Sequence, residues 1–571
     1  MSNALEQASL IMVPSGYEDG TLGSLKPTDG SGDFTFSRGS DISATRVNAD
    51  GNIEKGYENL LLQSNSFNTN WAQVNLLPPT DGQSGYDGTT DAWYFEKVGA
   101  FGRLQQSIST SGVRTLSVYL KAKDSSWASI EAAGTNTSRQ YFDLTNISKG
   151  SANNIISSSI EDVGDGWRRC SITYEGSKTL VFIFIAEGNG QVNGTTGSLY
   201  IQDAMINQGL VAYPYIETTT APVAGGILED MPRLDYSNGS CPALLLEPQR
   251  TNIVSSMLFP SLNSATYILS STKIGDGMPM QHFTKTAFGQ YAGHILNNQS
   301  ISSGDVIAFS MFFKPISAQN NFHKIQMSIQ DQDSPIYYDY SRDGFFNDVS
   351  GTPLPSNKYV EEYANGVYRI VHIQTSTASA TRINLNIDAY YNTTSQFLCG
   401  YAQVEQDATY PTSYIPTYGV SQTRLRDAQA ELTTPNGNVN EGTIFYEFDK
   451  AQAPTSYDIV PFKVGTNRIL RISQYNPNMR FSINENATSY NESNSYNSHI
   501  KVAVSYSSSS VKLFINGVLR ATDTTYSASG NVIIPANGLQ ATNIGCSLES
   551  KQLTYFPTAL TDSECIELTT I

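Results

Sequence analysis

Residues 115–122 read Thr-Leu-Ser-Val-Tyr-Leu-Lys-Ala, and residues 307–315 read Ile-Ala-Phe-Ser-Met-Phe-Phe-Lys-Pro. In the first stretch Leu116, Val118 and Leu120 alternate with more polar residues, which is the period-2 pattern of a half-buried β-strand. The second stretch alternates in the same way about 190 residues further along the chain, which predicts that one β-rich unit occurs twice.

Other landmarks recur in the same order and at about the same offset, roughly 190 to 200 residues. The opening of the first copy, Asn59-Leu-Leu-Leu-Gln-Ser, which continues to Trp71, matches Asn252-Ile-Val-Ser-Ser-Met in the second. A turn and strand, Asp165-Gly-Trp-Arg-Arg, matches Asn365-Gly-Val-Tyr-Arg. The closing segment, Tyr213-Pro-Tyr-Ile, matches Tyr410-Pro-Thr-Ser-Tyr-Ile. A period this long indicates duplicated domains and not a solenoid of small repeats.

The composition favours short strands joined by polar turns. Only 15% of residues are charged, whereas Tyr (33) and Phe (24) are abundant. Asp-Gly and Asn-Gly pairs such as Asp165-Gly166 supply turn chemistry between the strands. The run 180–185, Leu-Val-Phe-Ile-Phe-Ile, is apolar on both faces, as expected for a strand in the middle of a sandwich. The pattern of strands and turns in each repeat therefore predicts a jelly roll or related β-sandwich.

These landmarks also resemble a known family. An opening Asn-Leu-Leu-x-x-Ser-x-x-Phe-x-x-x-Trp, a strand ending in Lys-Ala, a Gly-Trp-Arg strand and a closing Tyr-Pro are similar to the carbohydrate-binding-module-like jelly rolls of bacteriophage structural proteins. The resemblance covers residues 59–217 and, more loosely, residues 252–417. It implies two jelly-roll modules that bind sugar or serve as spacers.

Two flanking stretches resemble the leaders of phage tail and fibre proteins. They are Phe34-Thr-Phe-Ser-Arg-Gly-Ser and the joint that begins Pro232-Arg-Leu-Asp-Tyr-Ser-Asn-Gly. The plain alternative is that both are interdomain connectors, with residues 244–246 plugging the edge of a sandwich. The two interpretations are compatible.

The last part of the chain is a different module. His499-Ile-Lys-Val-Ala-Val-Ser-Tyr alternates, and Asn516-Gly517 predicts a tight β-hairpin. Thr561, with Glu564 three residues later, forms a candidate capping box for a short helix. Residues 440–571 resemble the laminin-G and concanavalin A-like lectin/glucanase fold.

The predicted fold class is therefore all-β, with two duplicated jelly-roll modules followed by a concanavalin A-like lectin/glucanase sandwich. The expected domains are an N-terminal attachment arm (1–57), jelly-roll module 1 (58–222), a connector (223–251), jelly-roll module 2 (252–430) and a concanavalin A/laminin-G-like domain (431–571).

Charge and hydropathy exclude several classes of partner. The net charge is −17 and Lys and Arg form no cluster, so nucleic acid is not expected to bind. No apolar run is long enough to predict insertion into a membrane. The first residues show no basic export signal, and the five cysteines form no CxxC pair, so we expect free thiols and folding in a reducing cytoplasm.

The motifs do not predict an enzyme. Some concanavalin A-like glycosidases use a Glu-x-Asp-x-x-Glu strand, but here Glu447-Phe448-Asp449 is followed by Gln452 in place of the third acid. The five histidines are scattered, and neither HExxH nor a Gly-x-Ser-x-Gly elbow is present.

Acidic residues in the second repeat are candidates for a calcium site, the one cofactor that we consider. Carboxylate oxygens are ligands that Ca²⁺ prefers. The alternative is a solvated acidic loop. The candidate ligands are Asp331, Asp333, Asp343 and Asp348.

Sugar sites stack the apolar face of a sugar on exposed aromatic rings. Trp71 and Trp167 occupy repeat landmarks, so we expect both in the core. The candidates for carbohydrate binding are Trp93, Trp127, Tyr390 and Tyr391, with core packing as the alternative for each.

These features favour a non-enzymatic bacteriophage fibre or appendage subunit, assembled into the virion in the host cytoplasm. Its expected partners are other virion proteins, a host surface glycan and further copies of itself, as a trimer. One alternative is a bacterial surface or secreted glycan-binding adhesin, and another is a purely architectural capsid or tail decoration. The arm, residues 1–57, is the expected attachment element because it has few residues for a core.

Overall fold

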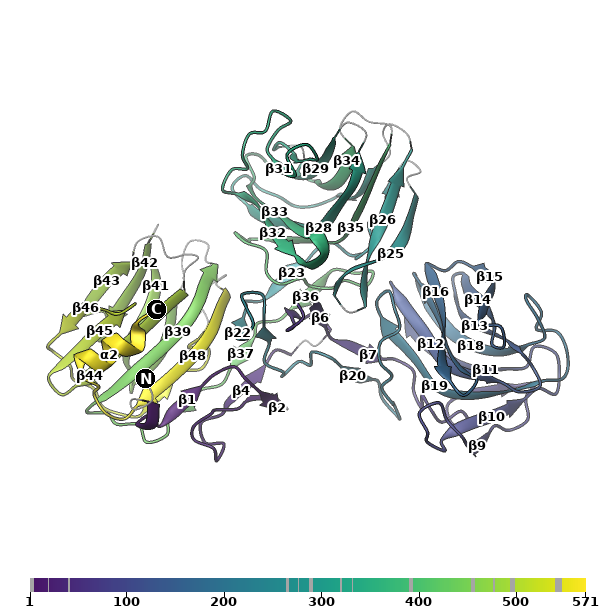
Figure 1. Cartoon of the computed structure of the whole chain (residues 1–571), viewed down its shortest axis with the longest axis horizontal. Helices are drawn as coiled ribbons and strands as arrows, with labels where there is room; N and C mark the ends of the chain where they lie inside the picture. The colour runs from purple at the N-terminus through teal and green to yellow at the C-terminus, as the bar shows by residue number, and fades with distance from the viewer. Residues whose placement is uncertain are drawn as a thin grey trace.

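The chain folds into three β-sandwiches around a central region (Figure 1). We call the sandwiches module 1 (residues 58–222), module 2 (253–411) and module 3 (435–571), and the central region, the described residues of 34–57, 223–252 and 412–434, the hub. The structure is a computed structural model that describes residues 5–18, 20–39, 42–262, 266–275, 277–286, 291–318, 321–330, 332–389, 394–452, 458–475, 478–492, 499–539 and 547–571.

Module 1 consists of two six-stranded sheets. The first has the order β16 (Ser157–Gly164), β17 (Trp167–Tyr174), β12 (Arg114–Ala122), β19 (Ser198–Gln208), β10 (Ala92–Glu96), β9 (Thr80–Gln83). The second has the order β15 (Ser148–Asn153), β14 (Thr137–Asp143), β13 (Trp127–Gly134), β18 (Lys178–Ala186), β11 (Arg103–Thr110), β8 (Ala72–Val74). Leu116, Val118 and Leu120 lie in the core between the sheets, as their alternation predicts.

Module 2 repeats this strand order. Its first sheet runs β32 (Lys358–Tyr363), β33 (Val367–Thr375), β28 (Val306–Ala318), β35 (Ser395–Gln406), β26 (Met278–Lys285), β25 (Thr266–Gly275), and its second runs β31 (Gly344–Phe346), β30 (Ile336–Asp339), β29 (Phe322–Ile329), β34 (Ile383–Ala389), β27 (Tyr291–Leu296), β24 (Ser261–Leu262). Each strand of module 1 has a counterpart at the same place in module 2, which confirms the duplication.

The landmark asparagines of the repeat, Asn59 and Asn252, form equivalent hydrogen bonds in the two copies. Asn59 Nδ2 donates to the carbonyls of Ala204 and Ile216, at 3.2 and 2.8 Å. Asn252 Nδ2 donates to the carbonyls of Ala402 and Ile415, at 3.1 and 3.0 Å. Each buried amide therefore ties the entry of its sandwich to its closing strand and to the segment that follows.

Module 3 also has two sheets. The first has the order β21 (Leu234–Asp235), β22 (Ala243–Leu246), β48 (Ser547–Phe556), β39 (Gly442–Gln452), β44 (His499–Ser507), β45 (Ser510–Ile515), β46 (Val518–Asp523). The second has the order β38 (Leu432–Thr433), β47 (Val532–Ile534), β40 (Asp458–Val464), β41 (Asn467–Tyr475), β42 (Asn478–Ile483), β43 (Thr488–Glu492). The predicted hairpin at Asn516-Gly517 and the capping box of Thr561 and Glu564 on helix α2 (Asp562–Thr569) are both confirmed. The described chain is thus all-β apart from short helical segments, as tandem sandwiches.

The N-terminal segment is not the free arm that its composition predicted. Strand β1 (Leu10–Met12) pairs with β48, so this segment completes the first sheet of module 3. The side chains of Leu10, Met12 and Phe34 are buried in the core of that module. A strand edge and an apolar core both need partners, and module 3 obtains them from the opposite end of the chain.

The connector after module 1 has a similar structural role. Strand β22 pairs with β48 next to β1, and Leu244 and Leu246 enter the core of module 3. The prediction that residues 244–246 plug a sandwich edge is therefore confirmed. Short strands make up the rest of the N-terminal segment and the hub. One sheet has the order β2 (Tyr17–Glu18), β3 (Thr21–Leu22), β4 (Phe34–Ser37), β37 (Ala428–Gln429), and β5 (Thr45–Val47) and β6 (Ile53–Lys55) extend module 2. Two further pairs are β7 (Tyr57–Asn59) with β20 (Val223–Gly225) and β23 (Arg250–Asn252) with β36 (Gln422–Arg424).

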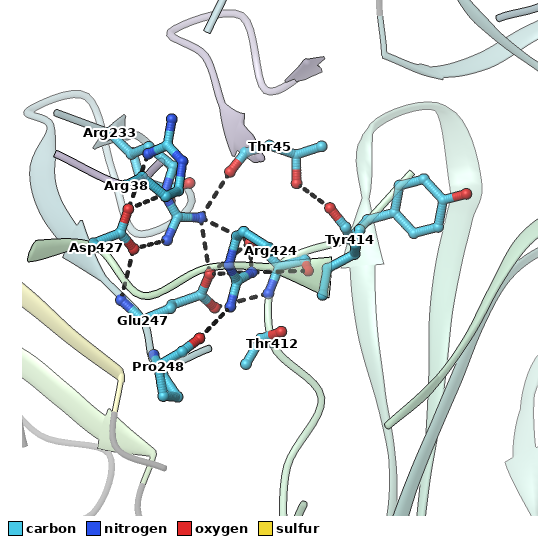
Figure 2. A network of polar contacts seen from close by, with 12 residues as sticks. Arg38, Thr45, Arg233, Glu247, Pro248, Thr412, Tyr414, Arg424 and Asp427 are labelled. Carbon is cyan, nitrogen blue, oxygen red and sulfur yellow. Dashed lines mark hydrogen bonds and ion pairs between the residues drawn. The ribbon is translucent and has the colours of Figure 1, made fainter. Parts of the chain in front are cut away.

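Two carboxylates and three arginines form a buried network of ion pairs in the hub (Figure 2). Arg233 Nη1 lies 2.8 Å from Glu247 Oε2, and Arg233 Nη2 bonds to Asp427 Oδ2. Arg38 Nη1 donates to Asp427 Oδ1 at 2.9 Å. Arg424 Nη1 lies 2.8 Å from Glu247 Oε2. An unpaired buried charge costs several kcal/mol, so these five side chains are stable only together.

The charged groups of this network come from three separate parts of the chain. Arg38 follows β4, Arg233 and Glu247 belong to the connector, and Arg424 and Asp427 follow module 2. Arg38 and Asp427 are 389 positions apart in the sequence. The network therefore fixes the N-terminal segment and both inter-module segments against one another.

A buried lysine lies where the hub meets module 1. Lys55 Nζ donates to the carbonyl of Gln208 at 3.1 Å and lies 4.3 Å from the ring centre of Tyr213 and 5.3 Å from that of Tyr418. Burial lowers the pKa of Lys55 to about 7. Residues of module 1, module 2 and the hub share one apolar cluster around this point, including Val113, Ile53 and Tyr418.

Four cysteines in the described residues are free thiols: Cys170, Cys399 and Cys565 are buried, and Cys241 is exposed. Among the described helices, none has the length and apolar character needed to span a bilayer.

We predict that Leu10→Ala lowers the free energy of unfolding of module 3 by about 2–5 kcal/mol, because the truncation leaves a cavity in a buried core. Thermal or urea unfolding measures the change. The exposed Leu25, 55% accessible in the same N-terminal segment, is the control, and Leu25→Ala should have almost no effect. If neither substitution changed the free energy of unfolding, the N-terminal segment would be a free arm after all.

We predict that the hub loses stability in acid. Burial by itself raises the pKa of Glu247 and Asp427, but the neighbouring arginines lower both to about 2. The folded pKa values lie below the unfolded values of ~4, so the stabilisation is complete above that pH and disappears as the pH falls toward 2. Each carboxylate contributes on the order of a few kcal/mol to this loss.

Thermal unfolding between pH 6 and 2 checks this prediction. Asp427→Asn should be less stable than the wild type at pH 6 and should show a shallower loss of stability in acid. Glu161→Gln, at an exposed position on β16, should keep the wild-type slope. An unchanged slope in Asp427→Asn would contradict the assignment.

Candidate functional site

Trp93 is part of the core of module 1 and not of its surface. Its side chain is 6% exposed and packs near Phe67, with the ring centres 6.3 Å apart. The indole Nε1 donates to the carbonyl of Asn65 at 2.8 Å. Both ring faces are covered by the protein, so Trp93 offers no surface for a sugar. Trp71 and Trp167 are also buried, as predicted.

Trp127, in contrast, lies at one end of the outer face of the second sheet in module 1, where Phe182 is half-buried and Tyr141 and Phe184 are buried. It is the first residue of β13 and is half-buried. Residues directly opposite one another on antiparallel strands share a face. Trp127 lies opposite Asp143 and Ala186, Ser129 opposite Tyr141 and Phe184, and Glu131 opposite Arg139 and Phe182. The same rows continue onto β11, with Arg103 opposite Phe184 and Gln105 opposite Phe182.

We call this surface the aromatic face; it comprises Trp127, Tyr141, Phe182, Phe184, Arg103, Gln105, Ser129, Glu131 and Arg139. The intervening residues of the same strands, such as Ile130 and Ile183, are in the core between the two sheets. In Figure 1 strands β11, β13, β14 and β18 lie on the side of module 1 away from the hub. The aromatic face is therefore not used to hold the three modules together.

The aromatic rings of this face are held by their neighbours. The rings of Phe182 and Phe184 are 5.7 Å apart and tilted by 56°. A Cβ atom on Gly150 of β15 would lie 2.8 Å from Trp127 Cζ3, so the indole lies against glycine backbone. Only a residue without a side chain leaves room for the ring there, and this contact fixes the orientation of Trp127.

Polar groups on the face are ordered in the same way. Arg139 pairs with Glu131 through two nitrogens, one of them at 2.9 Å (Nη2 to Oε2). Burial raises the pKa of Glu131, and Arg139 opposes this shift. Arg103 Nε donates to Gln105 Oε1 at 3.1 Å. The surface thus combines flat rings with hydrogen-bonding groups in fixed positions, which is the chemistry that binds sugars.

The equivalent sheet of module 2 has a different surface. On its outer face Gln326 lies opposite Asn386, and Ser328 lies opposite Asn384, while Ile325, Leu385 and their neighbours form the core. Phe182 and Phe184 of module 1 therefore correspond to amide side chains in module 2. Tyr390 and Tyr391, the candidates in this repeat, lie outside the described residues.

The proposed calcium ligands do not converge in the described part of module 2. Asp343 accepts a hydrogen bond from the hydroxyl of Tyr338, and Asp348 accepts backbone N–H groups of its own turn, from Ser350 at 2.9 Å and Thr352 at 3.1 Å. Asp331 lies outside the described residues. Within the described residues, no group of three His, Cys, Asp or Glu side chains is placed to hold a metal ion.

A lysine ammonium occupies the position where a cation would meet Asp333. Lys358 Nζ is buried 3.3 Å from Asp333 Oδ1, 2.7 Å from the carbonyl of Ser334 and 3.2 Å from Asn347 Oδ1. Asp333 Oδ2 also pairs with His372 Nε2 at 2.8 Å. The hydrogen bond from His372 lowers the pKa of Asp333. The protein's own cation thus satisfies these oxygen atoms.

The carboxylate pair of module 3 is engaged by a histidine. His499 Nε2 lies 2.9 Å from Glu447 Oε1, and His499 Nδ1 lies 2.6 Å from Asp449 Oδ1. Lys551 pairs with Asp449 as well. Glycoside hydrolysis needs one carboxyl group to protonate the leaving group and another that faces the sugar or a water. Here both carboxylates are engaged by side chains of the same sheet.

Trp127 was a candidate from the sequence, whereas its neighbours on the face were not. The signal was present in residues 180–185, where the apolar residues on the second face are aromatic. That run was interpreted as a strand covered on both sides. Strand β18 is central in its sheet, but only Val181, Ile183 and Ile185 face the core.

No family model matches this chain, and no curated protein matches its sequence. Among solved structures, the chain is similar to the binding domain of botulinum neurotoxin serotype D, with 14% identity over 25% of this chain and 40% of that one, at a TM-score of 0.19. It is also similar to the N-terminal CBM22-1–CBM22-2 tandem domain of Xyn10C from Paenibacillus barcinonensis, with 10% identity over 65% of this chain and 99% of that one, at a TM-score of 0.20. Both TM-scores are low, so the fold assignment depends on the strand order described above.

We predict that calcium does not stabilise module 2 through Asp333, because Lys358 already supplies the positive charge. Addition of Ca²⁺ or of EDTA should leave the midpoint of thermal unfolding unchanged. Lys358→Met should lower the stability by about 3–5 kcal/mol, since it leaves buried oxygen atoms without a donor. A calcium-dependent rise in the midpoint that disappears in Asp333→Asn would contradict this prediction.

Proposed function

We propose that this chain is a non-enzymatic, multi-module glycan-binding protein, and that it serves as a fibre or appendage subunit of a bacteriophage particle. The observation that carries the glycan-binding proposal is the aromatic face of module 1. The phage proposal is supported by the resemblance of the leader and joint stretches to those of virion proteins. The expected partners are host surface glycans and other virion proteins.

The aromatic face suits a sugar polymer for a physical reason. Pyranose rings have one apolar face, which stacks on aromatic side chains, and a rim of hydroxyl groups, which need hydrogen-bond partners. Trp127 and Phe182 supply half-buried aromatic surface, while Gln105, Arg103 and Arg139 supply donors and acceptors. The groups stand on adjacent strands of a packed sandwich, so binding orders few side chains.

A shallow surface of this kind binds one sugar segment weakly, but several such surfaces that bind together raise the overall affinity. We propose that several copies of the chain, as a trimer, present their faces together and bind one host surface at several points. The hub supports this arrangement because it joins module 1 to modules 2 and 3 through buried contacts. These contacts fix the orientation of the aromatic face relative to modules 2 and 3.

The absence of enzymatic activity is part of the proposal. It is supported by the contacts of Glu447 and Asp449 with His499, which occupy the carboxylates that a glycosidase would need. Binding without turnover is also what an adhesion protein requires.

We predict that Trp127→Ala and Phe182→Ala each weaken binding to polysaccharide about 10- to 100-fold, because each removes about 1.5–3 kcal/mol of aromatic burial. Affinity electrophoresis of the full chain, in gels that contain xylan, galactan, alginate or polygalacturonate, measures the retardation. Tyr337→Ala, on the equivalent sheet of module 2, is the matched control and should bind like the wild type.

The same incubations test the rest of the proposal. Released reducing ends should stay at background for every polymer, and Glu447→Gln should not change this result. Cleavage by the wild type that disappears in Glu447→Gln would show an enzyme instead. Binding that persists in both Trp127→Ala and Phe182→Ala would exclude the aromatic face as the site.

A further inference from the structure

We infer that the aromatic face selects glycans whose sugars carry a carboxylate group, and that Arg103 recognises this carboxylate. The inference deepens the proposed function of the same face and rests on it. Stacking on aromatic rings accepts neutral and acidic sugars alike, so selection needs a charged group at the site. Arg103 is placed to supply it.

Arg103 is held in a fixed position over the aromatic rings. Its guanidinium carbon lies 5.2 Å from the ring centre of Phe182 and 5.4 Å from that of Phe184. Its Nε donates to Gln105 Oε1 at 3.1 Å, and its Nη1 donates to the carbonyl of Phe101 at 3.2 Å. These contacts orient the planar group but leave Nη2 without an acceptor among the described residues.

The guanidinium of Arg103 is also not paired directly with a carboxylate of the described residues. Glu131 forms its ion pair with Arg139 and interacts with Arg103 only as a nearby charge. Asp143, opposite Trp127, already accepts backbone N–H groups of Thr145 and Asn146 at 3.1 and 3.0 Å. Arg103 is therefore the cation of the face that remains available to a ligand.

An arginine in this setting fits a carboxylate by geometry as well as by charge. The guanidinium is planar and binds carboxylate oxygens with parallel N–H donors. Arg103 lies on β11, next to the strand of Phe182 and Phe184, so its guanidinium is on the same face as a sugar stacked on Phe182 or Trp127. Uronate and sialate residues share this chemistry: a pyranose ring with one attached carboxylate.

General attraction does not explain such a preference. The protein carries a net charge of −17, so its overall field repels an acidic polymer. Preference for an acidic glycan must therefore come from a local contact that outweighs this repulsion. Arg103 provides such a contact at the proposed site.

The test compares polygalacturonate with its methyl-esterified form, which has the same backbone without the charge. The full chain is used at 150 mM NaCl, as wild type, Arg103→Gln and Arg103→Lys. Lys149→Gln, which removes an exposed cation of β15 in the same module, is the charge-matched control. We expect the wild type to bind the acidic polymer at least 10-fold more tightly than the ester.

Arg103→Gln should lose this preference and bind both polymers alike, Arg103→Lys should keep part of it, and Lys149→Gln should keep all of it. Digalacturonate and 3′-sialyllactose then distinguish the two sources of the carboxylate. Binding of either one that depends on Arg103 supports the inference.

Three results would overturn the inference. Equal losses in Arg103→Gln and Lys149→Gln would show unspecific attraction. Equal wild-type affinity for both polymers, with Trp127→Ala abolishing both, would remove the selection but leave glycan binding by the face intact. No binding to any polymer, with Trp127→Ala indistinguishable from the wild type, would remove the proposed function as well.

Discussion

The need to pair buried charges in the hub governs how the whole chain is assembled. Arg233 lies between Glu247 and Asp427, and neither carboxylate would be stable there without its arginines. These groups come from segments that are far apart in the sequence, so the pairing is completed only when the N-terminal segment and both inter-module segments have met in the hub. A network of this kind specifies one arrangement of the three sandwiches, because any other arrangement would leave charges buried without partners.

The three sandwiches are consequently not independent domains joined by linkers. Module 3 takes two strand segments, β1 and β22, from before and between the jelly rolls, and both lie along the free edge of β48. Coverage of that edge prevents it from pairing with another chain. The cost is a fold rich in long-range contacts, in which the last module depends on the first residues.

Duplication followed by divergence explains why two similar modules have different surfaces. In module 2 the outer face of the second sheet carries polar side chains such as Gln326 and Asn386. In module 1 the outer face of the second sheet is aromatic and points away from the hub. Both copies pack against the hub, and the aromatic side chains of module 1 form the surface that we propose for glycan binding.

The sequence by itself determined the strand pattern, the duplication, the hairpin at Asn516-Gly517 and the helix cap at Thr561, because each depends on residues close together in the chain. Alternation and turn chemistry are local, so they can be recognised without a structure. The sequence also made Trp93 and Trp127 candidates for exposure, since neither has a clear counterpart in the other repeat; of the two, Trp93 is buried and Trp127 is half-buried.

Only the tertiary structure decided what each segment contacts. The N-terminal residues have the composition of an arm, but a free edge on β48 and an apolar core make them part of module 3. The sequence does not distinguish Trp93 from Trp127. Trp93 lies in the core of module 1, whereas Trp127 lies on the outer face of a sheet. The position of Arg103 beside Phe184 depends on the register between β11 and β18, and Lys358 reaches Asp333 across 25 positions of sequence. Register and long-range pairing arise from packing of the whole chain, which no local pattern encodes.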